Sequence, residues 1–223
     1  PGYVETSTAG ARTMHLFAQQ QANQFAGGAP LRSYVLQRGD AAPKPDSVVF
    51  PSSVIELQRG APVRIVVHNN LPEPTAVHWH GLEIESFPDG VPYWSGLGAR
   101  VFSMIAPRDS FAAEFTPPRA GTYPYHTHFN DRDQMTSGLY GAVLVTDGPR
   151  DLAHDHLVVI GGRGPWIERA FESPYGAVNG GTNPPPLVLT AGEAHRLRIV
   201  SLHPDWAVNI TLQNDSTVAH WTP

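Results

Sequence analysis

Short apolar runs alternate with turn residues along the chain, and this pattern predicts β-strands. Apolar and polar positions alternate in 54–58, and a mainly apolar run follows at 63–68 after an Arg-Gly-Ala-Pro turn. No long stretch repeats its apolar residues every 3.6 positions, so we expect little helix. The predicted strands are 14–18, 33–37, 54–58, 63–68, 76–80, 101–105, 110–115, 121–126 and 139–146, with 129–137 a polar loop or one helical turn.

Strands at this spacing predict an all-β fold, a Greek-key β-sandwich. We place the sandwich at residues 31–149, after a leading segment or linker at 1–30. A second unit, 150–223, contains candidate strands at 157–160, 177–179, 187–189, 195–201 and 208–213. So few strands would leave exposed sheet edges, so we expect this second unit to be incomplete, or to be completed by something absent from the sequence.

Composition removes several classes of function. The 15 basic residues are dispersed and nearly all arginine, so there is no basic stripe for nucleic acid. No apolar run approaches the roughly 20 residues that a membrane helix needs, and we expect neither nucleic acid nor a membrane as a partner. The 223 residues include no cysteine, which excludes disulfides, thiolate metal sites and cysteine nucleophiles within this sequence.

Two short runs carry paired histidines, His78-Trp79-His80 and His126-Thr127-His128. Residues i and i+2 of a strand point to the same face, so each run offers two imidazoles on one side. If the two runs lie close together, four imidazoles converge on one patch. Neutral imidazole binds copper, zinc, iron and nickel. We therefore hypothesise a site for more than one metal ion.

The residues around these histidines resemble the multicopper oxidase family, in particular its laccase-like members. The resemblance covers the chain from about residue 54 to its end, and it is most specific at the two histidine motifs. The segments that carry it are Asn69-Asn70-Leu71 with Val77–Gly81, Phe115–His128, Gly138–Val145, and, more weakly, Val178–Gly180 with Ala191–Val200. The family implies cupredoxin-like domains, here one sandwich followed by part of a second.

The resemblance also implies a trinuclear copper cluster that reduces dioxygen to water and is held by eight histidines. By motif position, His78 corresponds to a ligand of the type 2 copper. His80 and His126 correspond to ligands of one type 3 copper, and His128 to a ligand of the other. Asp89 resembles an acidic residue that assists proton delivery, although Pro-Asp-Gly is also ordinary turn chemistry. Family members of this kind are periplasmic or secreted.

The sequence departs from the family in one large respect. It contains neither the His-Pro-x-His-x-His segment nor the His-Cys-His segment that supply the other four ligands and the type 1 copper site. We therefore expect this chain to supply half of the cluster. The remainder would come from a longer chain, a partner chain or a symmetry-related subunit. A small reducing substrate, such as a phenol or a metal ion, would be oxidised at the missing type 1 site.

Two other interpretations stay open. A cupin-like mononuclear metalloenzyme would use His78, His80, Glu85 and His126, and would leave His128 idle. A non-catalytic copper-binding module would hold copper without consuming oxygen. A third paired motif, His154-Asp155-His156, follows Gly-Pro in a predicted linker, so we do not expect it to bind metal. The remaining histidines are expected to be surface or hydrogen-bonded residues.

Overall fold

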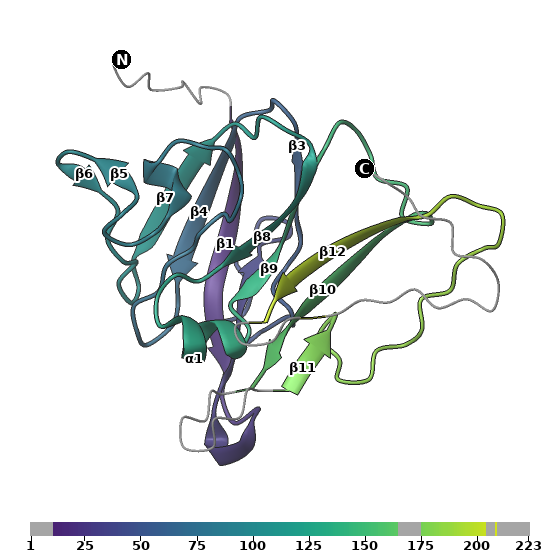
Figure 1. Cartoon of the computed structure of the whole chain (residues 1–223). Helices are drawn as coiled ribbons and strands as arrows, with labels where there is room; N and C mark the ends of the chain where they lie inside the picture. The colour runs from purple at the N-terminus through teal and green to yellow at the C-terminus, as the bar shows by residue number, and fades with distance from the viewer. Residues whose placement is uncertain (1–10, 165–174, 204–207, 209–223) are drawn as a thin grey trace.

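The computed structural model describes residues 11–164, 175–203 and 208, and within these it is almost entirely β-structure, as predicted. Two sheets face each other in a sandwich (Figure 1). The first has the strand order β2 (Leu31–Leu36), β1 (Arg12–Gln21), β4 (Val63–Asn69), β7 (Ser110–Phe115). The second has the order β3 (Ile55–Gln58), β9 (Tyr140–Thr146), β8 (Gly121–His126).

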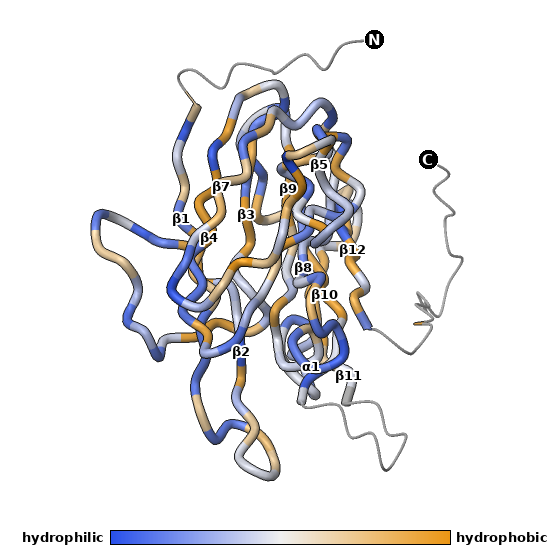
Figure 2. Tube along the Cα trace, turned by 90° about the vertical axis from the view of Figure 1, so that its left-hand side faces the viewer, coloured by the Kyte–Doolittle hydropathy of each residue, from blue (hydrophilic) through white to orange (hydrophobic). Residues whose placement is uncertain are grey.

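Apolar side chains from both sheets fill the space between them. Leu16 and Ile65 of the first sheet and Val143 of the second are fully buried in one cluster. Hydrophobic residues follow the strands, and hydrophilic residues dominate the turns (Figure 2). Burial of this kind is the main favourable term in folding. The sandwich is therefore a packed scaffold on which loops can hold functional groups.

The sandwich begins earlier in the chain than the predicted boundary at residue 31. Strand β1 pairs with β2 on one side and, in parallel, with β4 on the other, so it is an interior strand. Met14, Leu16 and Ala18 alternate into the core, which is why this segment belongs to the sheet. The predicted strand at 14–18 is confirmed, but residues 12–21 are not a linker.

Other segments that were predicted to be strands form less regular structure. Residues 76–80 make only one isolated bridge, His78 with His126, and Thr75 just before them bridges Ile105. Of residues 101–105, only Val101 lies in a strand, in the small hairpin of β5 (Gly96–Leu97) and β6 (Arg100–Val101). Residues 187–189 form no strand, and 209–213 lie outside the described residues. The short helical segments are η1 (Ala26–Gly28), η2 (Phe87–Asp89) and α1 (Asp131–Thr136).

A third sheet packs beside the sandwich, with the order β11 (Tyr175–Val178), β10 (Asp155–Arg163), β12 (Arg196–Leu202). The ring of Tyr140 from β9 packs against two of its glycines, Gly161 and Gly162. A Cβ added at Gly161 would lie 2.4 Å from that ring, and the Tyr140 hydroxyl donates a 2.9 Å hydrogen bond to the carbonyl of Gly162. The glycine at 161 is therefore what allows the two units to approach so closely.

A buried carboxylate network joins the third sheet to the sandwich. Asp155 accepts two hydrogen bonds from Arg198, at 2.6 and 2.8 Å, and Arg198 also donates to Thr122 of β8 at 2.9 Å. Arg150 bridges the backbone of Asp155 and the side chain of Glu56. The expected linker around Asp155 is thus the beginning of a strand, and the prediction of a linker there was wrong.

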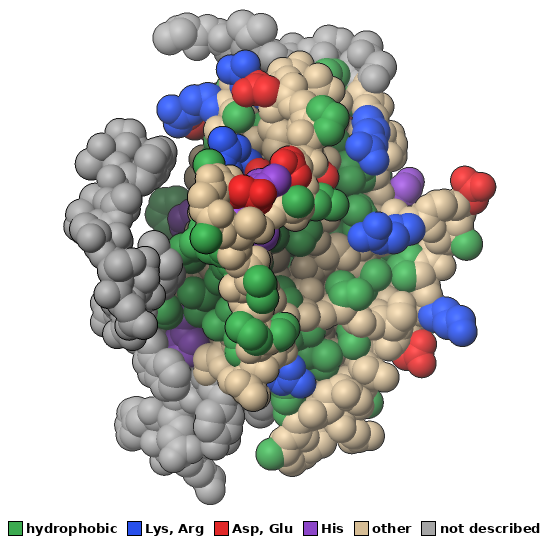
Figure 3. Space-filling view, turned by 90° about the vertical axis from the view of Figure 1, so that its right-hand side faces the viewer, with side chains coloured by type: hydrophobic (Ala, Val, Ile, Leu, Met, Phe, Trp, Pro, Cys, Tyr) green, Lys and Arg blue, Asp and Glu red, His purple; other side chains and the backbone are tan. Residues whose placement is uncertain are grey.

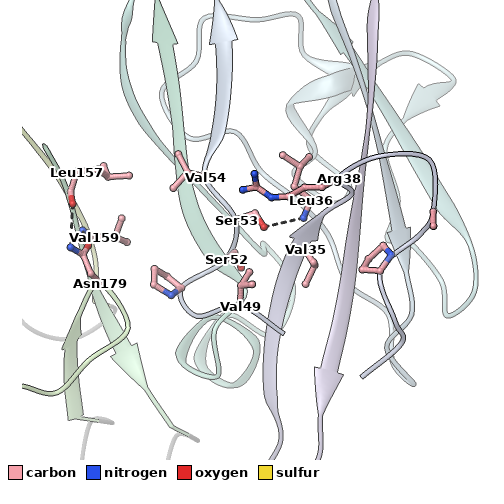
Figure 4. Close-up of a pocket in the computed structure, with 13 residues that line it drawn as sticks. Val35, Leu36, Arg38, Val49, Ser52, Ser53, Val54, Leu157, Val159 and Asn179 are labelled. Carbon is pink, nitrogen blue, oxygen red and sulfur yellow. Dashed lines mark hydrogen bonds between the residues drawn. The ribbon is translucent and has the colours of Figure 1, made fainter. Parts of the chain in front are cut away.

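A cavity of about 610 Å³ lies between the third sheet and the first. Leu157, Val159 and Asn179 face Val35 and Val49 across it (Figure 4). Its lining includes none of the predicted metal ligands. Among the described residues, no helix has the length and apolar character needed to cross a bilayer.

The Asp155 network predicts a pH-dependent loss of stability. Hydrogen bonds from Arg198 hold the pKa of Asp155 below its ordinary value, against the effect of burial. Because the folded-state pKa is lowered, the stabilisation is complete above the unfolded value of about 4 and is lost as pH falls through the folded value. Asp155→Asn should lower the free energy of unfolding by about 3 kcal/mol at pH 7, measured by denaturant unfolding.

The difference between Asp155→Asn and the unaltered chain should shrink as pH falls below about 4 and through the lower folded-state pKa, where Asp155 becomes neutral like Asn. Asp147 makes an exposed ion pair with Arg59 and provides the control. Asp147→Asn should change stability by less than about 1 kcal/mol. A loss for Asp155→Asn that is no larger than that of the control would contradict the interpretation.

Candidate metal centre

One pair of backbone hydrogen bonds brings the two histidine runs together. The amide of His78 donates to the carbonyl of His126 at 2.8 Å, and the amide of His126 donates to the carbonyl of His78 at 3.1 Å. This is the close-spaced pairing of antiparallel strands, in which opposite residues point to the same side. The two imidazole rings accordingly lie side by side, with centroids 5.5 Å apart.

The second histidine of each run joins the same patch. The ring of His80 lies 5.3 Å from that of His78 and 5.7 Å from that of His126. The ring of His128 lies 5.5 Å from His78 and 6.0 Å from His126. Nitrogen atoms of His78, His80 and His126 lie within 4.8 Å of one another, close enough for metal coordination. The structure thus brings together all four histidines that the sequence singled out.

The residues between the histidines point the other way, into the core. Trp79 and Thr127 are fully buried, and Trp79 stacks on Tyr125 with centroids 5.7 Å apart. His80 and His128 are exposed, whereas His126 is 9% exposed. The patch therefore has a fixed apolar floor and an open side from which further ligands can approach.

Gln134 of α1 holds the second run in place, and sequence reasoning did not find it. It is fully buried, and its side-chain carbonyl accepts hydrogen bonds from the hydroxyls of Thr75 and Thr127, both at 2.9 Å. Its amide group donates to the carbonyl of Pro74 at 2.8 Å. Gln134 thus links the residues just before the first histidine run to Thr127 of the second. No spacing in the polar segment 129–137 marks it beforehand.

Asp89 lies beside the cluster at the end of η2. The carbonyl of Asp89 accepts a 3.0 Å hydrogen bond from Nδ1 of His78, and its carboxylate lies 3.2 Å from the same nitrogen. Ser95 donates to the other carboxylate oxygen at 3.1 Å. The Nε2 atom of His78 is then left for a metal, as expected when a second partner fixes the tautomer of a ligating histidine.

The turn after Asp89 leaves room only for glycine. Gly90 has a φ of +79°, and a Cβ at this position would lie 1.8 Å from the carbonyl oxygen of Val77. The backbone of η2 therefore sits directly against the residue that precedes His78. This close approach is what puts Asp89 in contact with the imidazole.

The surroundings of the patch shift the pKa values of its histidines in different directions. Burial, together with the neighbouring imidazoles, lowers the pKa of His126 to about 4, although its hydrogen bond to the carbonyl of Thr127 opposes this. Burial also lowers the pKa of His78, but the hydrogen bonds and charge of Asp89 outweigh it and the net change is a rise. Burial raises the pKa of Asp131, a second carboxyl that sequence reasoning missed, while the charges of His128 and His78 lower it.

These residues fit copper. His126 donates from Nδ1 to the carbonyl of Thr127 at 2.6 Å, so its Nε2 is available, and its low pKa keeps the ring neutral as a ligand must be. Imidazole nitrogens are good copper donors. Glu85, the carboxylate required by the cupin-like interpretation, is not in the group of ligand atoms within 4.8 Å, whereas three histidines are.

Residues 48–150 match the model of a family described as multicopper oxidase. This segment, a little under half of the chain, is thus similar to a multicopper oxidase domain. Copper resistance protein A of Escherichia coli is 34% identical over 114 residues, which are 50% of this chain and 18% of that protein. The multicopper oxidase VdtB of Byssochlamys spectabilis is 36% identical over 140 residues, 56% of this chain and 18% of that protein. The matched part thus spans under a fifth of these relatives.

Solved multicopper oxidases also share the fold. The crystal structure of a multicopper oxidase from Pseudomonas thermotolerans matches with a TM-score of 0.66 and 25% identity. The match covers 86% of this chain and 47% of that chain. The blue copper oxidase of Nitrosomonas europaea has a TM-score of 0.65 and 20% identity, covering 86% and 61%. The cupredoxin-like fold expected from the sequence is confirmed by this similarity.

Gln134 provides a test of how the histidine runs are held. Gln134→Leu should destabilise the chain by about 2 kcal/mol, because two buried threonine hydroxyls and one carbonyl each lose a hydrogen bond. It should also weaken copper binding, because Thr127 lies between two of the histidines. Thermal unfolding and a copper titration measure the two effects. Gln24 is an exposed glutamine with one local hydrogen bond, and Gln24→Leu should change neither; equal effects of both substitutions would contradict the assignment.

Proposed function

We propose that this chain supplies half of the ligands of a trinuclear copper cluster in a laccase-like oxidase, which reduces dioxygen to water. The proposal rests on one observation, the convergence of four imidazoles with ring centroids 5.3–6.0 Å apart on a segment similar to a multicopper oxidase domain. By motif position, His78 would bind type 2 copper, His80 and His126 one type 3 copper, and His128 the other. Bound copper would supply the redox chemistry.

Protein side chains would position the ligands and move protons. The buried backbone pairing keeps His78 and His126 opposite each other, and the hydrogen bonds at their Nδ1 atoms orient both rings. Reduction of dioxygen to water consumes four protons and four electrons. Asp89 touches His78 and Ser95, so it is placed to pass a proton toward the open side of the cluster.

The remaining parts of the oxidase would come from outside this sequence. The other four histidine ligands and the type 1 copper site, where a phenol or a metal ion is oxidised, would lie in a longer chain, a partner chain or a symmetry-related subunit. We propose that residues 150–223 form part of a second cupredoxin-like domain, and that the protein is periplasmic or secreted. The family resemblance supports both proposals.

Copper binding by the chain tests the ligand set. His80→Gln together with His128→Gln removes two exposed imidazoles and should lower copper affinity at least about tenfold without unfolding the chain. Glu85→Gln is the matched control, and it should leave affinity unchanged. Copper binding that requires Glu85 and ignores His128 would support the cupin-like interpretation instead. The readout is copper bound per chain after a titration.

The role of Asp89 is tested in the complete oxidase, with its remaining ligands present. Asp89→Asn should keep copper bound but slow dioxygen consumption with a phenol by about 10²–10⁴-fold, the range of general acid catalysis. Asp109 lies in an exposed turn and hydrogen-bonds its own neighbour, so Asp109→Asn should not slow the reaction. Copper bound with no oxygen consumed by the unaltered complete assembly would favour a non-catalytic copper module.

A further inference from the structure

A second group of histidines lies on the third sheet and shares no residue with the first cluster. Strands β10 and β12 run parallel, with Asp155 opposite Arg196, so the residues that precede both strands meet at the same edge. Side-chain ligand atoms of His154, Glu193 and His195 lie within 4.8 Å of one another. The face that carries β10 and β12 shows histidine and acidic side chains gathered together (Figure 3).

Alternation along β10 directs these side chains away from the interior. Asp155 points into the arginine network, whereas the residues on either side of it face the edge. The rings of His154 and His195 have centroids 5.0 Å apart, and those of His156 and His195 are stacked at 5.3 Å. Nε2 of His156 lies 3.1 Å from Nδ1 of His195. The ring of His195 therefore contacts the rings of both His154 and His156.

Two carboxylates complete the group. Nε2 of His154 lies 2.9 Å from the Glu193 carboxylate, and its Nδ1 lies 2.6 Å from the Asp151 carboxylate. An imidazole held by a carboxylate through one nitrogen, with its other nitrogen facing a second acidic ligand, is the arrangement of a metal-binding histidine and its outer partner. Two acidic groups also supply the negative charge that a divalent cation needs.

We propose that His154, Glu193 and His195 bind one divalent transition-metal ion of the zinc class, with Asp151 orienting His154. Two imidazoles and one carboxylate form a donor set typical of zinc and leave a fourth position for water. The ion would replace the hydrogen bond between His154 and Glu193, together with one of the two hydrogen bonds of His195, which are to His156 and from the amide of Thr190. It would join His154 and Glu193, which are 39 residues apart in sequence and lie just before β10 and β12. The expectation that His154-Asp155-His156 does not bind metal is replaced by this proposal.

Zinc binding to the purified chain tests the proposal. His80→Gln with His128→Gln provides a background in which the first cluster is weakened. In that background, isothermal titration with Zn²⁺ should detect one bound ion per chain, and Glu193→Gln or His195→Gln should lower its affinity at least about tenfold. Glu83→Gln is the matched control, because Glu83 is an exposed carboxylate paired with Arg119. It should leave zinc affinity unchanged.

Two further measurements separate a metal ligand from a structural residue. Co²⁺ in place of zinc should give the visible absorption of a four-coordinate site, and Glu193→Gln should remove it while the thermal unfolding of the metal-free chain stays the same. In the chain with an intact first cluster, Glu193→Gln should reduce the zinc bound by one equivalent. The absence of zinc binding in the background variant, or binding that survives both substitutions, would overturn the proposal. Neither result bears on copper at the first cluster.

Discussion

The candidate copper site depends on the two backbone hydrogen bonds between His78 and His126. They make these residues direct neighbours across an antiparallel bridge, and the two-residue period of extended chain then brings His80 and His128 to the same side. A shift of one residue in this pairing would send the imidazoles into the core and the buried Trp79 to the surface. The same strand register thus determines both which side chains are buried beneath the site and which imidazoles form it.

Much of this arrangement follows from the sequence because extended chain has a simple period. Apolar runs between turns predicted the strands of both sheets, and the two-residue period predicted the common face of the paired histidines. The sequence did not predict that the two runs lie close together, because this needs a bridge between residues 48 positions apart. It also depends on hydrogen bonds from Gln134, which lies in a segment without a clear pattern. The role of residues 12–21 was missed for the same reason, since their parallel partner β4 lies far along the chain.

The sequence predicted one of the two histidine groups and missed the other, and both outcomes have the same cause. The first was found because both of its runs are paired motifs that resemble a family. The second was set aside because His154-Asp155-His156 follows a Gly-Pro turn, and its partners Glu193 and His195 carry no pattern of their own. Only the parallel pairing of β10 with β12 brings them together, and that pairing is a tertiary contact. Asp155 points inward to Arg198, and this orients its neighbours in the chain outward, toward the second histidine group.

Asp89, the last residue of η2, and Gly90, which follows it, differ in which substitutions they tolerate. The Asp89 side chain is partly exposed beside His78, so under the proposed function the main effect of replacing it falls on proton transfer. Any side chain at position 90 meets the carbonyl of Val77 at 1.8 Å, so the cost falls on folding. A library of variants selected only for abundance would keep diversity at position 89 and lose it at position 90, whereas selection for the proposed oxidase activity would narrow both.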